Sequence, residues 1–291
     1  MSSKQNILPV LGVLSGALVW GLIWYPYRVL QDMGVSGSLS TMLSYLLALG
    51  VGILAAPHAL RGYLRAGWAA WGLLLTAGWT NFGYVLAMLE GEVMRVLLLF
   101  YLSPLWTVLF SYWLLGERLN RYGYAVIGLS LGGAAVMLWQ PDSGLPLPQN
   151  RAEWLGLSAG MAFALSNVIS RRAEHLRVEW KSLSVWLGTA LLTLPLLGGT
   201  AAVGQIQAIS AYGWLLLVLI GVALCGITFS VQYGVSHMPA NRAIVLFMTE
   251  LVFAAASSYL LVGEVMGPGE YAGALLLVSA SLLSGKLYES H

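Results

Sequence analysis

The chain has 291 residues, of which 58% are apolar and 9% charged, and its formal net charge is +2. Soluble domains carry about 25% charged residues, so this chain lacks the polar side chains needed to cover a soluble fold, and its small net charge argues against a nucleic-acid partner. The single cysteine, Cys225, excludes an internal disulfide and a cysteine-ligated metal site.

Apolar runs of about 20 residues recur along the chain, the length that a helix needs to cross about 30 Å of hydrocarbon. In lipid each backbone polar group must be satisfied internally, which favours helices over open strands. The first run continues without a cleavage pattern, so we expect a retained helix rather than a signal peptide. The sequence predicts an all-α polytopic membrane protein with ten spans, at about 8–30, 38–56, 67–88, 93–114, 121–139, 153–171, 181–199, 210–232, 240–262 and 269–288.

The basic residues fall unevenly on the two sides of this topology. If the N-terminus is cytoplasmic, the outer side receives three, Arg28, Arg95 and Arg151. The inner side receives eleven, which are Lys4, Arg61, Arg65, Arg118, Arg121, Arg171, Arg172, Arg177, Lys181, Arg242 and Lys286. Positive residues concentrate in cytoplasmic loops, so both termini are predicted to be cytoplasmic.

The chain repeats itself. At an offset of 147 residues the same residue types align, namely Arg95 with Arg242, Phe100 with Phe247, Tyr112 with Tyr259, Gly116 with Gly263 and Glu117 with Glu264. The sequence thus predicts two five-helix repeats, residues 1–140 and 153–291, and because five is odd the repeats lie in opposite orientations in the membrane. Inverted repeats of this kind are typical of alternating-access carriers, whose substrate site lies near the midplane between the halves.

Three segments carry a family resemblance: ALVWGLIW in the first span, LSPLWTVLFSYWLLGERL in the fourth and TELVFAAASSYLLVGE in the ninth. They resemble EamA-type transporters of the drug/metabolite transporter superfamily, over essentially the whole chain. The many aromatic residues look most like the aromatic amino-acid exporter (YddG-type) branch. Arg95, Arg242 and Leu251 depart from the family pattern. The resemblance implies export of aromatic and other neutral amino acids across the bacterial inner membrane.

Several aromatic side chains fall near the middle of predicted spans, away from the interfaces that tryptophan and tyrosine prefer. They are Trp20, Tyr84, Tyr101, Trp106 and Phe163. They are candidates for lining a substrate cavity, although packing between helices would also explain them. Asn81 shares a helix face with Tyr84. Pro104 removes a backbone donor and should kink the fourth span, which either exposes carbonyls to substrate or simply bends the helix.

Glu250 lies in the middle of the ninth span, where a carboxylate costs about 3 kcal/mol on insertion scales. It should therefore face protein or water, and three roles stay open: binding a substrate ammonium, exchanging a proton, or holding helices together. Arg95, Arg242 and His237 are further candidates for gating or coupling. Snorkelling of the arginines and ordinary hydrogen bonding of the histidine are the alternatives.

Small residues in several spans favour close helix packing, including the pairs Gly12 and Gly16, and Gly128 and Gly132. No phosphate-binding loop, metal motif or nucleophile with a base occurs, so we expect a transporter without cofactor or metal rather than an enzyme. Its partners should be a small-molecule substrate and the lipid bilayer, as a monomer or homodimer. The alternatives are a broad-range drug/metabolite exporter and an aromatic-lined channel.

Overall fold

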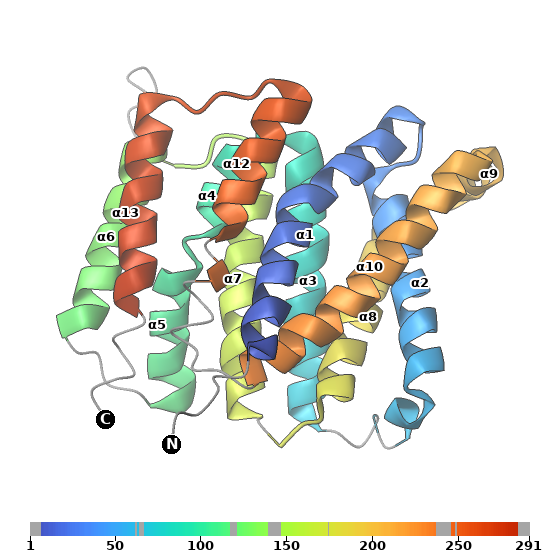
Figure 1. Cartoon of the computed structure of the whole chain (residues 1–291), viewed down its shortest axis with the longest axis horizontal. Helices are drawn as coiled ribbons and strands as arrows, with labels where there is room; N and C mark the ends of the chain where they lie inside the picture. Colours follow the sequence, from blue (N-terminus) through green and yellow to red (C-terminus); the bar gives the residue numbers. More distant parts are fainter. Residues whose placement is uncertain are drawn as a thin grey trace.

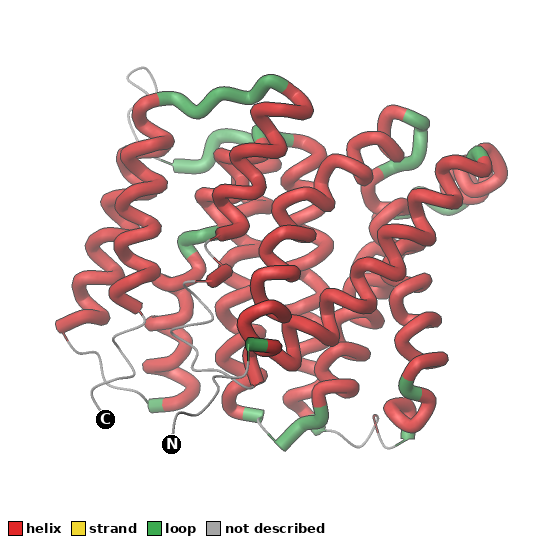
Figure 2. Tube along the Cα trace, viewed as in Figure 1, coloured by secondary structure: helices red, strands yellow, loops and turns green. Residues whose placement is uncertain are grey.

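The fold is a bundle of helices in a computed structural model that describes residues 7–61, 63, 67–116, 121–138, 147–173, 175–236, 246–247 and 249–284, with no strand among them (Figure 2). The first half contains α1 (Leu8–Asp32), α2 (Gly37–Ala55), η1 (Pro57–Leu60), α3 (Trp68–Glu90), α4 (Val93–Phe100), α5 (Ser103–Leu115) and α6 (Arg121–Leu138). The second half contains α7 (Arg151–Arg172), α8 (Val178–Thr193), η3 (Leu194–Leu196), α9 (Thr200–Ala208), α10 (Ala211–Ser236), α12 (Thr249–Val262) and α13 (Pro268–Ser284).

Six segments of the described chain are long and apolar enough to cross a membrane: α1, α2, α3, the α4–α5 pair, α7 and α10. The region of α8, η3 and α9 adds a seventh if it is counted as one span. The protein is therefore a multi-pass membrane protein. The helices α6, α12 and α13 coincide with predicted spans but are short, at 18, 14 and 17 residues, so the number ten stays a prediction.

The predicted fourth span is broken into two helices. The first, α4, ends at Phe100, and α5 begins at Ser103 with Pro104 in its first turn. Proline has no N–H, and its ring clashes with the carbonyl four residues earlier, which explains why a continuous helix stops before it. The break leaves Tyr101 at the junction, with its backbone N–H donating to Leu97 O at 2.9 Å.

The chain turns sharply after α8, a feature that the sequence did not predict. The axes on either side of the turn differ by 115°. Gly198 (φ +66°) and Gly199 (φ +56°) form it, and glycine adopts this left-handed conformation without a Cβ clash. Beyond the turn α9 is tied to the α1–α2 connection, because Ser36 N donates to Gln205 Oε1 at 3.0 Å.

The helix contacts follow the predicted duplication (Figure 1). The helix α3 of the first repeat packs against α7 and α8 of the second repeat. Its counterpart α10 in the second repeat packs against α1 and α2 of the first. Likewise α5 contacts α7, and α12 contacts α1, while α2–α8 and α6–α13 each pair two counterparts. Exchanging the repeats maps this set of contacts onto itself, so the two units interleave around a shared centre.

Glycines allow the closest helix approaches. A Cβ on Gly160 would lie 2.3 Å from Phe100 O, and one on Gly12 would lie 2.5 Å from Ser230 O. The packing role predicted for Gly128 and Gly132 is wrong within the part of the chain that the structure describes, because a Cβ on either would meet no described atom within 4 Å. Their neighbour Gly133 faces α13 instead, where a Cβ would lie 3.1 Å from Gly273 O.

Candidate functional site

A cavity of about 140 Å³ lies between α1, α2, α3, α7, α8, α10 and α12 and the α4–α5 junction. Its walls carry four apolar aromatic rings, Trp20, Phe100, Phe163 and Phe247. Phe100 and Phe247 are aligned positions of the two repeats, so equivalent residues from both halves meet at one cavity. This is the place where the predicted pair of inverted repeats would put a substrate site.

The rings of this wall pack on one another. The centroids of Phe100 and Phe163 are 5.2 Å apart, and Tyr84 meets Phe100 edge-on at 5.4 Å. On the other side Trp20 and Phe247 are 5.8 Å apart. Such contacts fix ring orientations, so the cavity presents rigid faces to a flat apolar group.

Glu250 is the polar centre of the cavity and is 4% exposed. The Tyr84 hydroxyl donates to its Oε1 and the Tyr101 hydroxyl donates to its Oε2, both at 2.9 Å. A buried carboxylate is tolerated when its oxygens accept hydrogen bonds. Because both phenols come from the first repeat and Glu250 from the second, these bonds join the two halves.

Amide and hydroxyl groups line another part of the cavity. Tyr45 OH donates to Asn81 Oδ1 at 2.7 Å, and Asn81 Nδ2 donates to Ala77 O at 2.8 Å. These bonds orient the amide of Asn81 on the same face of α3 as Tyr84. Asn167 and Gln232 add two further amides from α7 and α10.

Six of the eight predicted substrate-binding residues line this cavity: Trp20, Asn81, Tyr84, Tyr101, Phe163 and Glu250. Pro104 and Trp106 are not among the lining residues. Pro104 lies just after the break between α4 and α5, and this break places Tyr101 in the cavity wall. Trp106 packs against the apolar cluster around α4, and its buried Nε1 has no hydrogen-bond partner among the described residues.

Lys181 is a cavity residue that the sequence did not single out. Its side chain is buried at 8% exposure, and Nζ donates to Ser170 O at 3.1 Å. In the sequence it stands at the start of a predicted span and counts as one of many inner-side basic residues. Only the packing of α8 against α3 and α2 reveals that it reaches the cavity.

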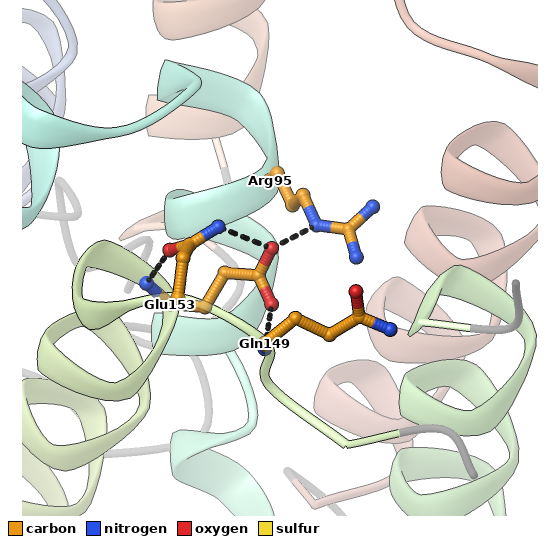
Figure 3. A network of polar contacts seen from close by, with 4 residues as sticks. Arg95, Gln149 and Glu153 are labelled. Atoms are coloured by element: carbon orange, nitrogen blue, oxygen red, sulfur yellow. Dashed lines mark hydrogen bonds and ion pairs between the residues drawn. The ribbon is translucent and has the colours of Figure 1, made fainter. Parts of the chain in front are cut away.

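Arg95, a predicted gating residue, lies in a second polar cluster at the other end of α4 (Figure 3). Its Nε donates to Glu153 Oε1 at 2.6 Å, and this carboxylate also accepts from Gln149 N and Asn150 Nδ2. This pairing holds the start of α4 against the start of α7. Arg242 and His237, the other gating candidates, lie outside the described residues.

Glu264 completes this second polar cluster. Its carboxylate accepts from Val93 N at 3.1 Å and Met94 N at 2.9 Å, so it caps the N-terminus of α4. Burial raises the pKa of Glu264, and the two backbone donors partly oppose that change. The segment between α12 and α13 is thus bound to the N-terminus of α4 in the first repeat.

Comparisons with known proteins agree with this architecture. The model of the EamA-like transporter family matches residues 7–139 and 150–285, as two units. A protein of Archaeoglobus fulgidus named as an uncharacterized transporter is 26% identical over 78% of this chain and 80% of its own length. Another protein named as an uncharacterized transporter, from Pseudomonas aeruginosa, is 30% identical over an aligned segment that covers 41% of this chain and 37% of that relative. One solved protein structure, at 20% identity, shares the fold with a TM-score of 0.63 over 97% of both chains.

Proposed function

This chain belongs to the EamA-like transporter family, and we propose that it exports aromatic and other neutral amino acids by alternating access. The family and its relatives indicate a transporter rather than an enzyme. The aromatic amino-acid exporter branch and the substrate are our proposals.

The observation that carries the substrate proposal is the mixed lining of the cavity. Rigid aromatic faces from Trp20, Phe100 and Phe163 suit a flat apolar side chain. The described lining residues include one acidic residue, Glu250, and one basic residue, Lys181. An amino-acid zwitterion carries an ammonium and a carboxylate that match this pair, and the amides of Asn81 and Gln232 can add hydrogen bonds.

The shape of the cavity supports the direction of transport. It reaches Ser170 near the end of α7, Lys181 near the start of α8 and Gln232 near the end of α10. The predicted topology places these helix ends on the cytoplasmic side, while the outer ends are held together by Arg95 and Glu264. In this arrangement an exporter would load its substrate from the cytoplasm.

We further propose that the protein lies in a bacterial inner membrane with ten spans in two inverted repeats and with both termini cytoplasmic. The excess of basic residues on the inner side supports this orientation. The small-molecule substrate and the bilayer are then its partners, and a monomer or a homodimer fits equally.

The test is transport by purified protein in liposomes. We expect saturable counterflow of labelled phenylalanine, weaker counterflow of threonine, and little uptake of a lipophilic cationic dye. Faster transport of the dye than of phenylalanine would favour a broad-range drug/metabolite exporter, for which the carboxylate of Glu250 between aromatic rings is the supporting observation. Flux without saturation or counterflow would instead indicate a channel.

A further inference from the structure

The two phenols that hold Glu250 each have a second acceptor within reach. Tyr84 OH lies 2.9 Å from Glu250 Oε1 and 3.3 Å from Trp20 O. Tyr101 OH lies 2.9 Å from Glu250 Oε2 and 2.9 Å from Phe247 O. A phenol has one hydrogen to donate and can accept at its oxygen, so each hydroxyl can turn from the carboxylate to a backbone carbonyl without moving its ring.

This geometry satisfies hydrogen bonding in both protonation states of Glu250. When the carboxylate is ionised, both phenols donate to it. When it takes up a proton, the new O–H donates to one phenol oxygen, and that phenol turns its own hydrogen to the carbonyl of Trp20 or Phe247. The second phenol keeps donating to the remaining carboxyl oxygen. No buried polar group loses its partner, so gaining a proton carries no penalty for an unpaired group.

Among the described residues, the groups that face Glu250 at close range are neutral. Tyr84 faces it from α3, Tyr101 from the α4–α5 junction and Trp20 from α1. The part of α10 that lines the cavity contributes Thr228 and Gln232, and α8 contributes Lys181, the other charged residue among the described lining residues. Within the described chain no Lys, Arg or His lies within 4.0 Å of the carboxylate. An anion without a close cation is costly in a membrane interior, and a proton removes that cost.

We propose that Glu250, Tyr84 and Tyr101 form a proton-binding site between the two repeats, in which Glu250 carries the proton and the phenols adjust to both states. The proton adds to the carboxylate and is later released from the same oxygen, so no other bond changes. Proton binding stands independently of the substrate. The coupling that follows from it rests on the proposed function: a substrate ammonium and a proton cannot neutralise the same carboxylate together, so amino acid and proton would exchange.

The site also lies where coupling must act. The phenols belong to the first repeat and the carboxylate to the second, so they surround the proton together only while α12 is docked against α3 and the α4–α5 junction. A ligand shifts a carrier between two states only if its binding free energy differs between them. The proton on Glu250 meets that requirement, because a state in which this contact opens removes the phenols from the carboxyl group.

The first experiment measures proton binding without substrate. Infrared difference spectra of purified protein, recorded while the pH is varied, should show a carboxylic-acid C=O band that titrates. The band should be absent in Glu250→Gln and retained in Glu264→Gln, a matched removal of a carboxylate outside the cavity. Tyr84→Phe and Tyr101→Phe keep the ring but remove one donor to the anion, so proton affinity should rise by about tenfold in each. A band set identical in wild type and Glu250→Gln would overturn the proposal.

The second experiment measures coupling in liposomes that contain a pH-sensitive dye. An outward phenylalanine gradient should move protons the other way through the wild type. The Glu250→Gln variant should transport phenylalanine more weakly, because the substrate ammonium loses its carboxylate partner, and the phenylalanine that it still transports should move no protons. Titration of the Glu250 band without phenylalanine transport would refute the proposed substrate and leave the proton site standing. Phenylalanine transport by wild type with no titrating Glu250 band would refute the proton site alone.

Discussion

Two tryptophans at predicted mid-span positions have different surroundings. Trp20 lines the cavity beside Phe247, whereas Trp106 packs away from it against the apolar cluster of α4. Ring contacts contribute about 0.5–1.5 kcal/mol beyond burial. We therefore expect Trp20→Ala to weaken phenylalanine transport relative to threonine by about 2- to 10-fold in kcat/KM. Competition transport assays measure this ratio, with Trp106→Ala as the control that leaves it unchanged. An equal loss for both substrates in Trp20→Ala would assign that residue to packing.

The residues of the site were predictable to different degrees. An acid in the middle of an apolar run has to face protein or water, so Glu250 was singled out on energetic grounds. An indole in the middle of a span can pack between helices or line a cavity equally well, and Trp106 packs between helices. Lys181 stands near a helix end, where basic residues are common, and its burial depends on how α8 packs on α3 and α2. The rotation of each helix about its own axis cannot be read from the apolar pattern of an almost uniformly apolar span.

At the scale of whole helices, α3 and α8 approach so closely that only glycine fits between them. A Cβ on Gly188 would lie 1.9 Å from Leu74 O, a backbone atom that cannot turn away. Overpacking of this kind costs about 1–3 kcal/mol. Gly188→Ala should therefore lower the melting temperature in a thermal-unfolding assay of detergent-solubilised protein. Gly128→Ala, where a Cβ meets no described atom within 4 Å, should leave it nearly unchanged. Equal melting of the two variants would show that α3 and α8 are not packed this closely.

The cap that Glu264 places on α4 makes the contact between α4 and the α12–α13 connection sensitive to pH. Burial raises the pKa of Glu264 while this contact is closed, and in an opened, hydrated state the pKa returns to its ordinary value. The closed state therefore binds the proton more tightly. As the pH falls through the interval between the two pKa values, the closed state gains stability, and as the pH rises through it that gain is lost. Nearby Glu92 acts in the same direction as burial, and Arg28 opposes it.

We expect the contact that Glu264 makes with α4 to open more readily at a pH above the interval between the two pKa values of Glu264 than at a pH below it. The measurement is the labelling rate of a cysteine at Val96, which lines the second polar cluster, in a protein whose Cys225 is replaced by alanine. The same cysteine in a Glu264→Gln background corrects for titration of the thiol. The ratio of the two rates should rise with pH. A ratio independent of pH would contradict the role given to Glu264.

The helices themselves were largely predictable, because apolar runs and turn residues mark most of their ends. Two features were not. The break before Ser103 depends on whether the helix bends at Pro104 or stops, and both satisfy the proline. The turn into α9 relies on Gly198 and Gly199, a pair that in sequence alone also fits a plain loop. Local chemistry at these points allows several structures, and packing selects one.

For the whole molecule, the duplication and the distribution of charge predict one topology. In Figure 1 the described start of α1 and the described end of α13 lie toward the same face of the bundle. With both termini cytoplasmic, exposed residues before α7 should face outward and those between α7 and α8 inward. In a Cys225→Ala background, cysteine at Gln149 should react with an impermeant maleimide in intact cells, and cysteine at His175 should react only after lysis; both positions are exposed. The reverse labelling pattern would show that the protein has the opposite orientation in the membrane, and the cavity would then load substrate from the opposite side.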